Sequence, residues 1–169
     1  MNSLQPLALI GLSLMLGLTS AAHAQFACTT TNGAITITGY TGPGGDVIIP
    51  NIINGLPVTS IGPVAFFGCP TVTNIAIPNT VASIGQGAFA DCTNLLSVAI
   101  PNTVTNVGTL AFVNTGLTNV IIPDSVTDIG DFAFESCASL TSVIIPDNVR
   151  SIRTGVFSYC TGLTNVMIG

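Results

Sequence analysis

Residues 77–104 read IPNTVASIGQGAFADCTNLLSVAIPNTV, and residues 122–149 repeat them as IPDSVTDIGDFAFESCASLTSVIIPDNV. Copies that begin on Ile-Pro follow one another in steps of 28, 23, 22 and 23 residues, with their prolines at Pro50, Pro78, Pro101, Pro123 and Pro146. A phenylalanine recurs at nearly the same spacing, as Phe66, Phe89, Phe112, Phe134 and Phe157. A period of this length, sustained five times, predicts a solenoid in which each repeat stacks on the next.

Each repeat contains two extended segments. Residues 97–100 alternate small and large apolar side chains, which is typical of a strand with one buried face, and Pro101 ends that strand. A second extended segment, residues 81–84, precedes Gly85 and a tight turn or helical segment that carries Phe89. The sequence therefore predicts a β-rich, right-handed coil of five ~23-residue repeats, with a parallel β-sheet on its concave side.

Stacking the repeats in register predicts ladders of buried side chains. Besides the five phenylalanines they are Ile75/Val98/Val120/Val143/Val166, Ile77/Ile100/Ile122/Ile145/Ile168 and Val72/Leu95/Leu117/Leu140/Leu163.

The consensus I-P-x-x-V-x-x-I-G-x-x-A-F-x-x-C-x-x-L-x-x-V resembles the BspA-like subclass of leucine-rich repeats, which is common on bacterial and protist surfaces. The resemblance implies a leucine-rich-repeat solenoid, adhesion or partner binding, and surface display, and it brings no catalytic residues with it. Residues 31–45 resemble the short β-rich segment that precedes such arrays. The expected organisation is an export signal at 1–24, a β-rich lead-in or cap at 25–48 and the repeat array at 49–169.

The first 24 residues have the pattern of an export signal, although residues 1–6 carry no Lys or Arg. Residues 7–18 form an apolar run, and Ala22-His23-Ala24 supplies small residues at positions −3 and −1 of a cleavage site before Gln25. A short membrane anchor is the alternative, but this run is shorter than the roughly 20 residues that a spanning helix needs. We expect a secreted or cell-surface protein with no membrane insertion after cleavage.

Charged residues are scarce, with seven Asp and Glu against two Lys and Arg, and the two cations are Arg150 and Arg153. Nucleic-acid binding needs several cations on phosphates and is not expected. Residues 25–169 contain no His and no Lys, so we expect no enzyme, no catalytic residue and no cofactor. One repeat carries four carboxylates, which we interpret as solvated surface charge rather than an acid/base pair or a calcium site: Asp124, Asp128, Asp131 and Glu135.

Four cysteines share one position of the repeat: Cys69, Cys92, Cys137 and Cys160. Neighbouring ladder positions lie ~4.8 Å apart, which suits the Cα atoms of a disulfide but exceeds the ~3.5–4.5 Å that its Cβ atoms prefer. A ladder of buried thiols is the favoured interpretation. Bridges Cys69–Cys92 and Cys137–Cys160, which leave Cys28 unpaired, are the alternative that an oxidising compartment favours. No metal site is expected, because each pair supplies only two thiolates.

The outward face of the predicted sheet is the candidate partner-binding surface. Its two columns are Asn74/Ser97/Asn119/Ser142/Asn165 and Ala76/Ala99/Ile121/Ile144/Met167. The second column becomes large and apolar towards its C-terminal end, which either marks an interaction site or reflects strand propensity alone. Because aromatic sugar platforms are missing from this face, we expect a protein or peptide ligand on a host or neighbouring cell.

The predicted function is a secreted or cell-surface leucine-rich repeat protein that mediates protein binding or adhesion through its concave sheet. The alternative is a structural, self-associating surface-layer module that pairs end to end through an open strand edge, or a fragment of a longer repeat adhesin. A threonine lattice that binds ice or a mineral is a further interpretation, which Leu96 and the uneven repeat steps disfavour.

Overall fold

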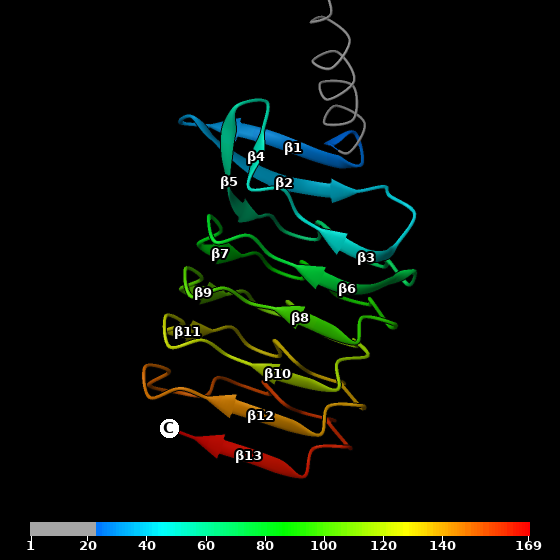
Figure 1. Cartoon of the computed structure of the whole chain (residues 1–169). Coiled ribbons are helices and arrows are strands. Elements are labelled where there is room, and N and C mark those ends of the chain that lie inside the picture. Colours follow the sequence, from blue (N-terminus) through cyan, green and yellow to red (C-terminus); the bar gives the residue numbers. More distant parts are fainter. Residues whose placement is uncertain (1–22) are drawn as a thin grey trace, which may run out of the picture.

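The computed structural model describes residues 23–169, so the predicted export signal lies outside the described part except for its last two residues. The described chain forms one coil whose turns stack along a single axis (Figure 1). Within residues 23–169 no helix is long and apolar enough to cross a membrane. The predicted solenoid with parallel sheets is confirmed.

One side of the coil carries a parallel sheet, here called the main sheet. Its strands, in order along the axis, are β3 (Gly45–Ile48), β6 (Val72–Ala76), β8 (Ser97–Ala99), β10 (Asn119–Ile121), β12 (Ser142–Ile145) and β13 (Asn165–Ile168). The first three strands and the last three are each hydrogen-bonded together. The two groups adjoin where the Thr118 amide donates to the Leu96 carbonyl at 3.3 Å. The main sheet has six strands because the chain before Pro50 adds β3 ahead of the predicted five.

A second sheet forms the next side of the coil. Its strands are β1 (Phe26–Thr31), β2 (Ala34–Tyr40), β5 (Leu56–Ile61), β7 (Ser83–Ile84), β9 (Asn106–Val107) and β11 (Asp128–Ile129). Strands β1 and β2 pair antiparallel, and the remaining neighbours pair parallel. A short strand β4 (Ile52–Ile53) pairs antiparallel with β5 and accounts for the extra length of the first repeat step. The first repeat therefore begins with a hairpin instead of the short connection that the later repeats use.

The third side of the coil consists of turns and is here called the turn face: residues 63–69, 86–92, 109–115, 131–137 and 154–160. In the second of these segments the Ala90 amide donates to Gly87 and the Cys92 amide to Phe89, at 3.1 and 3.3 Å, so two consecutive turns stand where a turn or helical segment was expected. The Phe89 amide donates to the Ala111 carbonyl of the next coil at 2.8 Å. Hydrogen bonds between coils thus continue outside the sheets.

The core is organised around the predicted phenylalanine ladder. Phe66, Phe89, Phe112 and Phe134 are fully buried, and their neighbouring ring centroids lie 5.1 Å apart. At the N-terminal end the ring of Tyr40 stacks on Phe66 at the same 5.1 Å, so the β1–β2 hairpin covers the first ring of the ladder. Each of these four phenylalanine rings therefore stacks on an aromatic ring that precedes it along the axis of the coil.

The ladder prediction is wrong for the last coil. Val166 and Ile168 of β13 are 48% and 74% exposed, because no further coil packs against them within the described residues. Val98 and Ile100 are half-buried, and the remaining positions of these two ladders, apart from Val166 and Ile168, are buried. At the last coil, burial of a ladder position thus depends on its neighbours along the axis.

Candidate binding surface

The outward face of the main sheet brings the ten predicted binding residues into two columns. Strand register pairs Asn74 with Ser97 and Ala76 with Ala99. Further along the axis it aligns the other six residues, as Asn119/Ser142/Asn165 and Ile121/Ile144/Met167. All ten are exposed or half-buried, as the alternation of the strands predicts. Whether they contact a partner stays a prediction.

The apolar column has large side chains at both ends and small ones in its middle. Ile121, Ile144 and Met167 are 65%, 37% and 49% exposed. Strand pairing also places Ile48 beside Ala76 in this column, and Ile48 is 75% exposed. Sequence reasoning missed Ile48, although residues 46–50 read DVIIP and closely match NVIIP at 119–123 and SVIIP at 142–146.

The polar side chains of this face make hydrogen bonds to neighbouring coils. Asp46, also missed from the sequence, accepts a hydrogen bond of 2.5 Å from the side-chain amide of Asn74. The hydroxyl of Thr141 donates to the carbonyl of Thr118 at 3.0 Å, and Thr164 donates in the same way to Thr141 at 3.4 Å. Thr118, Thr141 and Thr164 form a column of threonines beside the polar column, and because their hydroxyls already donate to backbone carbonyls, they have few free donors for a ligand.

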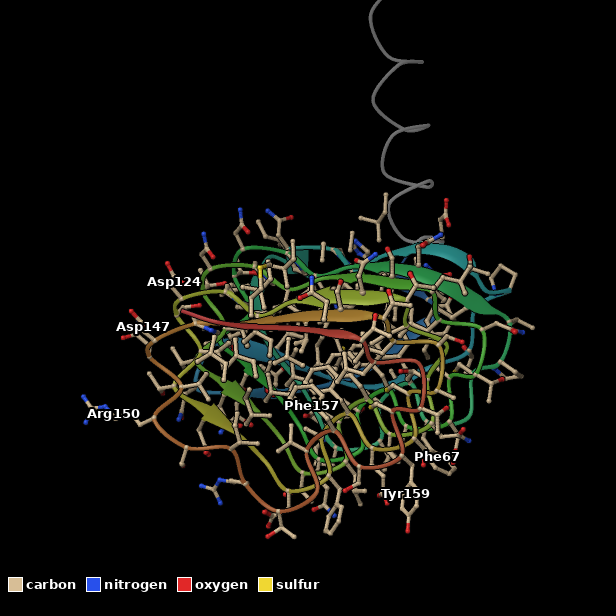
Figure 2. All side chains as sticks on the ribbon, turned by 90° about the horizontal axis from the view of Figure 1, so that it is seen from below. Phe67, Asp124, Asp147, Arg150, Phe157 and Tyr159 are labelled. Atoms are coloured by element: carbon tan, nitrogen blue, oxygen red, sulfur yellow. The ribbon has the colours of Figure 1, made fainter. Side chains whose placement is uncertain are left out.

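Two carboxylates flank the apolar column at its C-terminal end. Asp124 and Asp147 follow the prolines that end β10 and β12, and both point outward at one corner of the coil (Figure 2). They line a hollow of about 360 Å³ together with Ile144. This end of the face therefore combines exposed apolar side chains with negative charge.

The four carboxylates of the fourth repeat do not form a joint site. Asp128 makes an ion pair with Arg153 at 2.8 Å, and Asp131 accepts the Thr154 amide at 3.0 Å. Among residues 23–169 no group of three or more His, Cys, Asp or Glu side chains is placed to hold a metal ion.

The cysteine column lies at the edge of the turn face, where the chain turns back towards the main sheet. All five cysteines of the described chain are thiols in this structure. The buried Cys92 donates to the Phe66 carbonyl at 3.0 Å, and burial raises the pKa of the Cys92 thiol to about 12. The Cys137 thiol donates to the Phe112 carbonyl at 3.2 Å, and the Cys160 thiol donates to the Phe134 carbonyl at 3.1 Å. These thiols complete hydrogen bonds between coils and are inward parts of the solenoid.

The stacked coils and their regular exposed columns define a leucine-rich-repeat solenoid, a scaffold that presents surfaces for protein interaction. Residues 59–169 match the family model described as the BspA type leucine rich repeat region, in 6 copies. The chain belongs to this family.

Solved bacterial structures share the fold. A leucine-rich repeat protein from T. pallidum is 30% identical, with a TM-score of 0.69, and the match covers 85% of this chain and 79% of that one. A leucine-rich cell surface protein from Faecalibacterium prausnitzii is 29% identical, with a TM-score of 0.73 and coverage of 83% and 37%. A third, from Bacteroides ovatus, is 28% identical, with a TM-score of 0.57 and coverage of 84% and 51%. No curated protein matches this chain closely enough to count as a relative.

Proposed function

We propose that this protein is a secreted or cell-surface binding module that contacts a partner protein through the outward face of its main sheet. The observation that carries the proposal is the row of Ile121, Ile144 and Met167, which stay 65%, 37% and 49% exposed on adjacent strands. Contiguous exposed apolar side chains are costly in water and commonly mark interaction sites. The similarity to a structure described as a cell surface protein supports display outside the cell.

The charge around this row indicates the chemistry of the partner. Asp124 and Asp147 flank the row, and the chain has a net charge of −5 with only two cationic side chains. A partner surface that is apolar at its centre and carries Lys or Arg at its rim would complement both features. Binding, rather than catalysis, is the activity that this surface supports.

The test is a binding assay of the purified protein on immobilised extracellular-matrix proteins and on intact cells. The double variant Ile121→Asp/Ile144→Asp places two charges in the row, and we expect binding to weaken at least about thirtyfold, as for a hot spot. The matched control is Ile48→Asp, the same substitution in the same column three strands from Ile121, which should retain binding. Circular dichroism spectra of both variants check that the coil is intact. Equal binding by the double variant and the control would contradict the proposal.

A further inference from the structure

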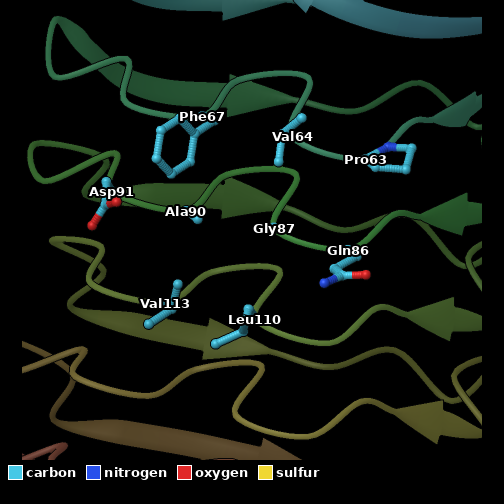
Figure 3. A pocket seen from close by; sticks show the side chains of 9 residues that line it. All are labelled: Pro63, Val64, Phe67, Gln86, Gly87, Ala90, Asp91, Leu110 and Val113. Atoms are coloured by element: carbon cyan, nitrogen blue, oxygen red, sulfur yellow. The ribbon is translucent and has the colours of Figure 1, made fainter.

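The turn face carries a groove on the side of the coil that faces away from the main sheet. Its volume is about 320 Å³, and its floor is formed by Gly87 and Ala90 of the second coil. Figure 3 shows Val64 and Phe67 above this floor and Leu110 below it. The groove exists because two small side chains lie between coils that carry large ones.

The large side chains of this groove stay in contact with water. Val64 and Phe67 are each 56% exposed, and Phe67 points outward on the far side of the coil from β13 (Figure 2). Val64 and Leu110 have φ angles of 50° and 58°, a region that a β-branched residue such as valine rarely adopts. The positive φ recurs at this position in every coil, as in Phe132 and Gly155. The exposure of Val64 and Phe67 is therefore the feature that indicates a partner.

Another coil of the same chain shows which side chain fits the notch, the part of the groove that lies over Gly87. Gly155 occupies the position of Gly87 three coils further on, with φ angles of 62° and 59°. There the ring of Phe132, from the coil above, lies on the glycine, and a Cβ atom at Gly155 would collide with the ring. At Gly87 the residue above is Val64, whose nearest methyl group would lie 3.4 Å from such a Cβ atom and which is too short to cover the notch. The open notch is therefore shaped for one aromatic ring.

A carboxylate lies at one end of the groove. One oxygen of Asp91 accepts a hydrogen bond of 2.8 Å from the side-chain amide of Asn114. Among residues 23–169 the one ion pair is Asp128–Arg153, so no cation of the described chain neutralises Asp91. A second copy of the chain, with its net charge of −5, is a poor electrostatic match for this end.

We propose that the groove over Gly87 binds an aromatic side chain of a partner protein or peptide, with an adjacent Lys or Arg of that partner on Asp91. The site is independent of the main sheet, so it adds a second contact to the proposed binding function. The contact is small, and a short peptide alone should bind weakly, with a dissociation constant on the order of 1–10 mM.

The test uses ¹⁵N-labelled protein and the peptide acetyl-Gly-Phe-Arg-Gly-amide, followed by amide chemical shifts. We expect the shifts to change around Gly87, Ala90 and Asp91, and to change much less when Ala replaces the Phe or Glu replaces the Arg of the peptide. Val64→Phe should fill the notch from within, as Phe132 does over Gly155, and abolish the response. Asp91→Asn retains the hydrogen bond to Asn114 and should weaken binding of the Arg peptide by about two- to fivefold.

Each outcome decides the proposal. Changes confined to this groove, and lost in Val64→Phe, support it. No change up to about 20 mM peptide, or changes elsewhere on the coil, would overturn it. An unaltered response in both Val64→Phe and Asp91→Asn would do the same, and Asp91→Asn keeps the test valid should Val64→Phe fail to fold. The variant Ile121→Asp/Ile144→Asp should respond like the unmodified protein, so this site and the main-sheet site can fail separately.

Discussion

The rings of Phe112 and Phe134 lie 5.1 Å apart, centroid to centroid, with their planes only 5° from parallel. This spacing matches the ~4.8 Å between neighbouring strands of a sheet, which means that the stack repeats at the same interval as the backbone of the coil. Both rings are fully buried. The phenylalanine ladder therefore joins each coil to the next, and its loss should affect the cohesion of the whole array.

Replacing Phe112 by Ala removes a ring from the middle of the ladder. We expect the free energy of unfolding to fall by about 3–5 kcal/mol, because the ring is buried and has a stacked neighbour on each side. Phe157→Ala should cost less, since Phe157 is half-buried and stacks on Phe134 alone. Urea denaturation followed by circular dichroism measures both. Similar losses for the two variants would show that stacking between coils contributes little.

A second prediction concerns the glycines that follow the short strands. A Cβ atom on Gly108 would lie 2.7 Å from the backbone of Gly85 and Gln86 in the coil above. Gly108→Ala should therefore push two coils apart and destabilise the protein by about 1–3 kcal/mol or more.

The matched control for this glycine is Gly68→Asn. Gly68 has a φ of 63° but open space around its Cβ position, and Asp91 and Asn114 occupy the same place in later coils with φ of 59° and 54°. Asparagine tolerates this conformation, so the change should stay within about 0.5 kcal/mol. Thermal melts of the two variants give the comparison, and equal destabilisation would contradict the role assigned to the close approach of the coils at Gly108.

The repeat period was enough to predict the solenoid, because recurring apolar positions report burial directly. Phe66 and Phe134, for example, recur at the repeat spacing and are both fully buried. The alternation in the strands likewise predicted which side chains of β10 and β12 face outward. Exposure at the last coil could not be read in this way, since Val166 has the same local sequence as its buried equivalents and differs only in its neighbours.

Two parts of the candidate sites could not be predicted from spacing alone. The insertion that forms β4 lengthens the first step, so Ile48 fell outside the regular array although its strand adds to the same sheet. The groove over Gly87 depends on what the adjacent coils carry at the same position. Gly87 and Ala90 are unremarkable in sequence, and only the stacked structure shows that they separate Val64 from Leu110.

The buried thiol of Cys92 provides a prediction of pH dependence. Its pKa is raised from 9.0 to about 12 in the folded protein because burial disfavours the thiolate. A raised folded-state pKa means that the contribution of this group to stability is complete below pH 9. It is lost as the pH rises from 9 towards 12, where the unfolded chain releases the proton and the folded chain retains it.

Cys92→Ala separates this effect from the other titrating groups. At pH 7 the variant should be less stable by about 1 kcal/mol, because it loses the hydrogen bond to the Phe66 carbonyl. Between pH 9 and 12 the unmodified protein should lose stability faster than the variant, so the difference should shrink or reverse. Urea denaturation at pH 7, 9 and 11 measures it, with the remaining cysteines and tyrosines present in both proteins. A difference that stays constant across this range would mean that the Cys92 thiol titrates in the folded protein as it does in the unfolded chain.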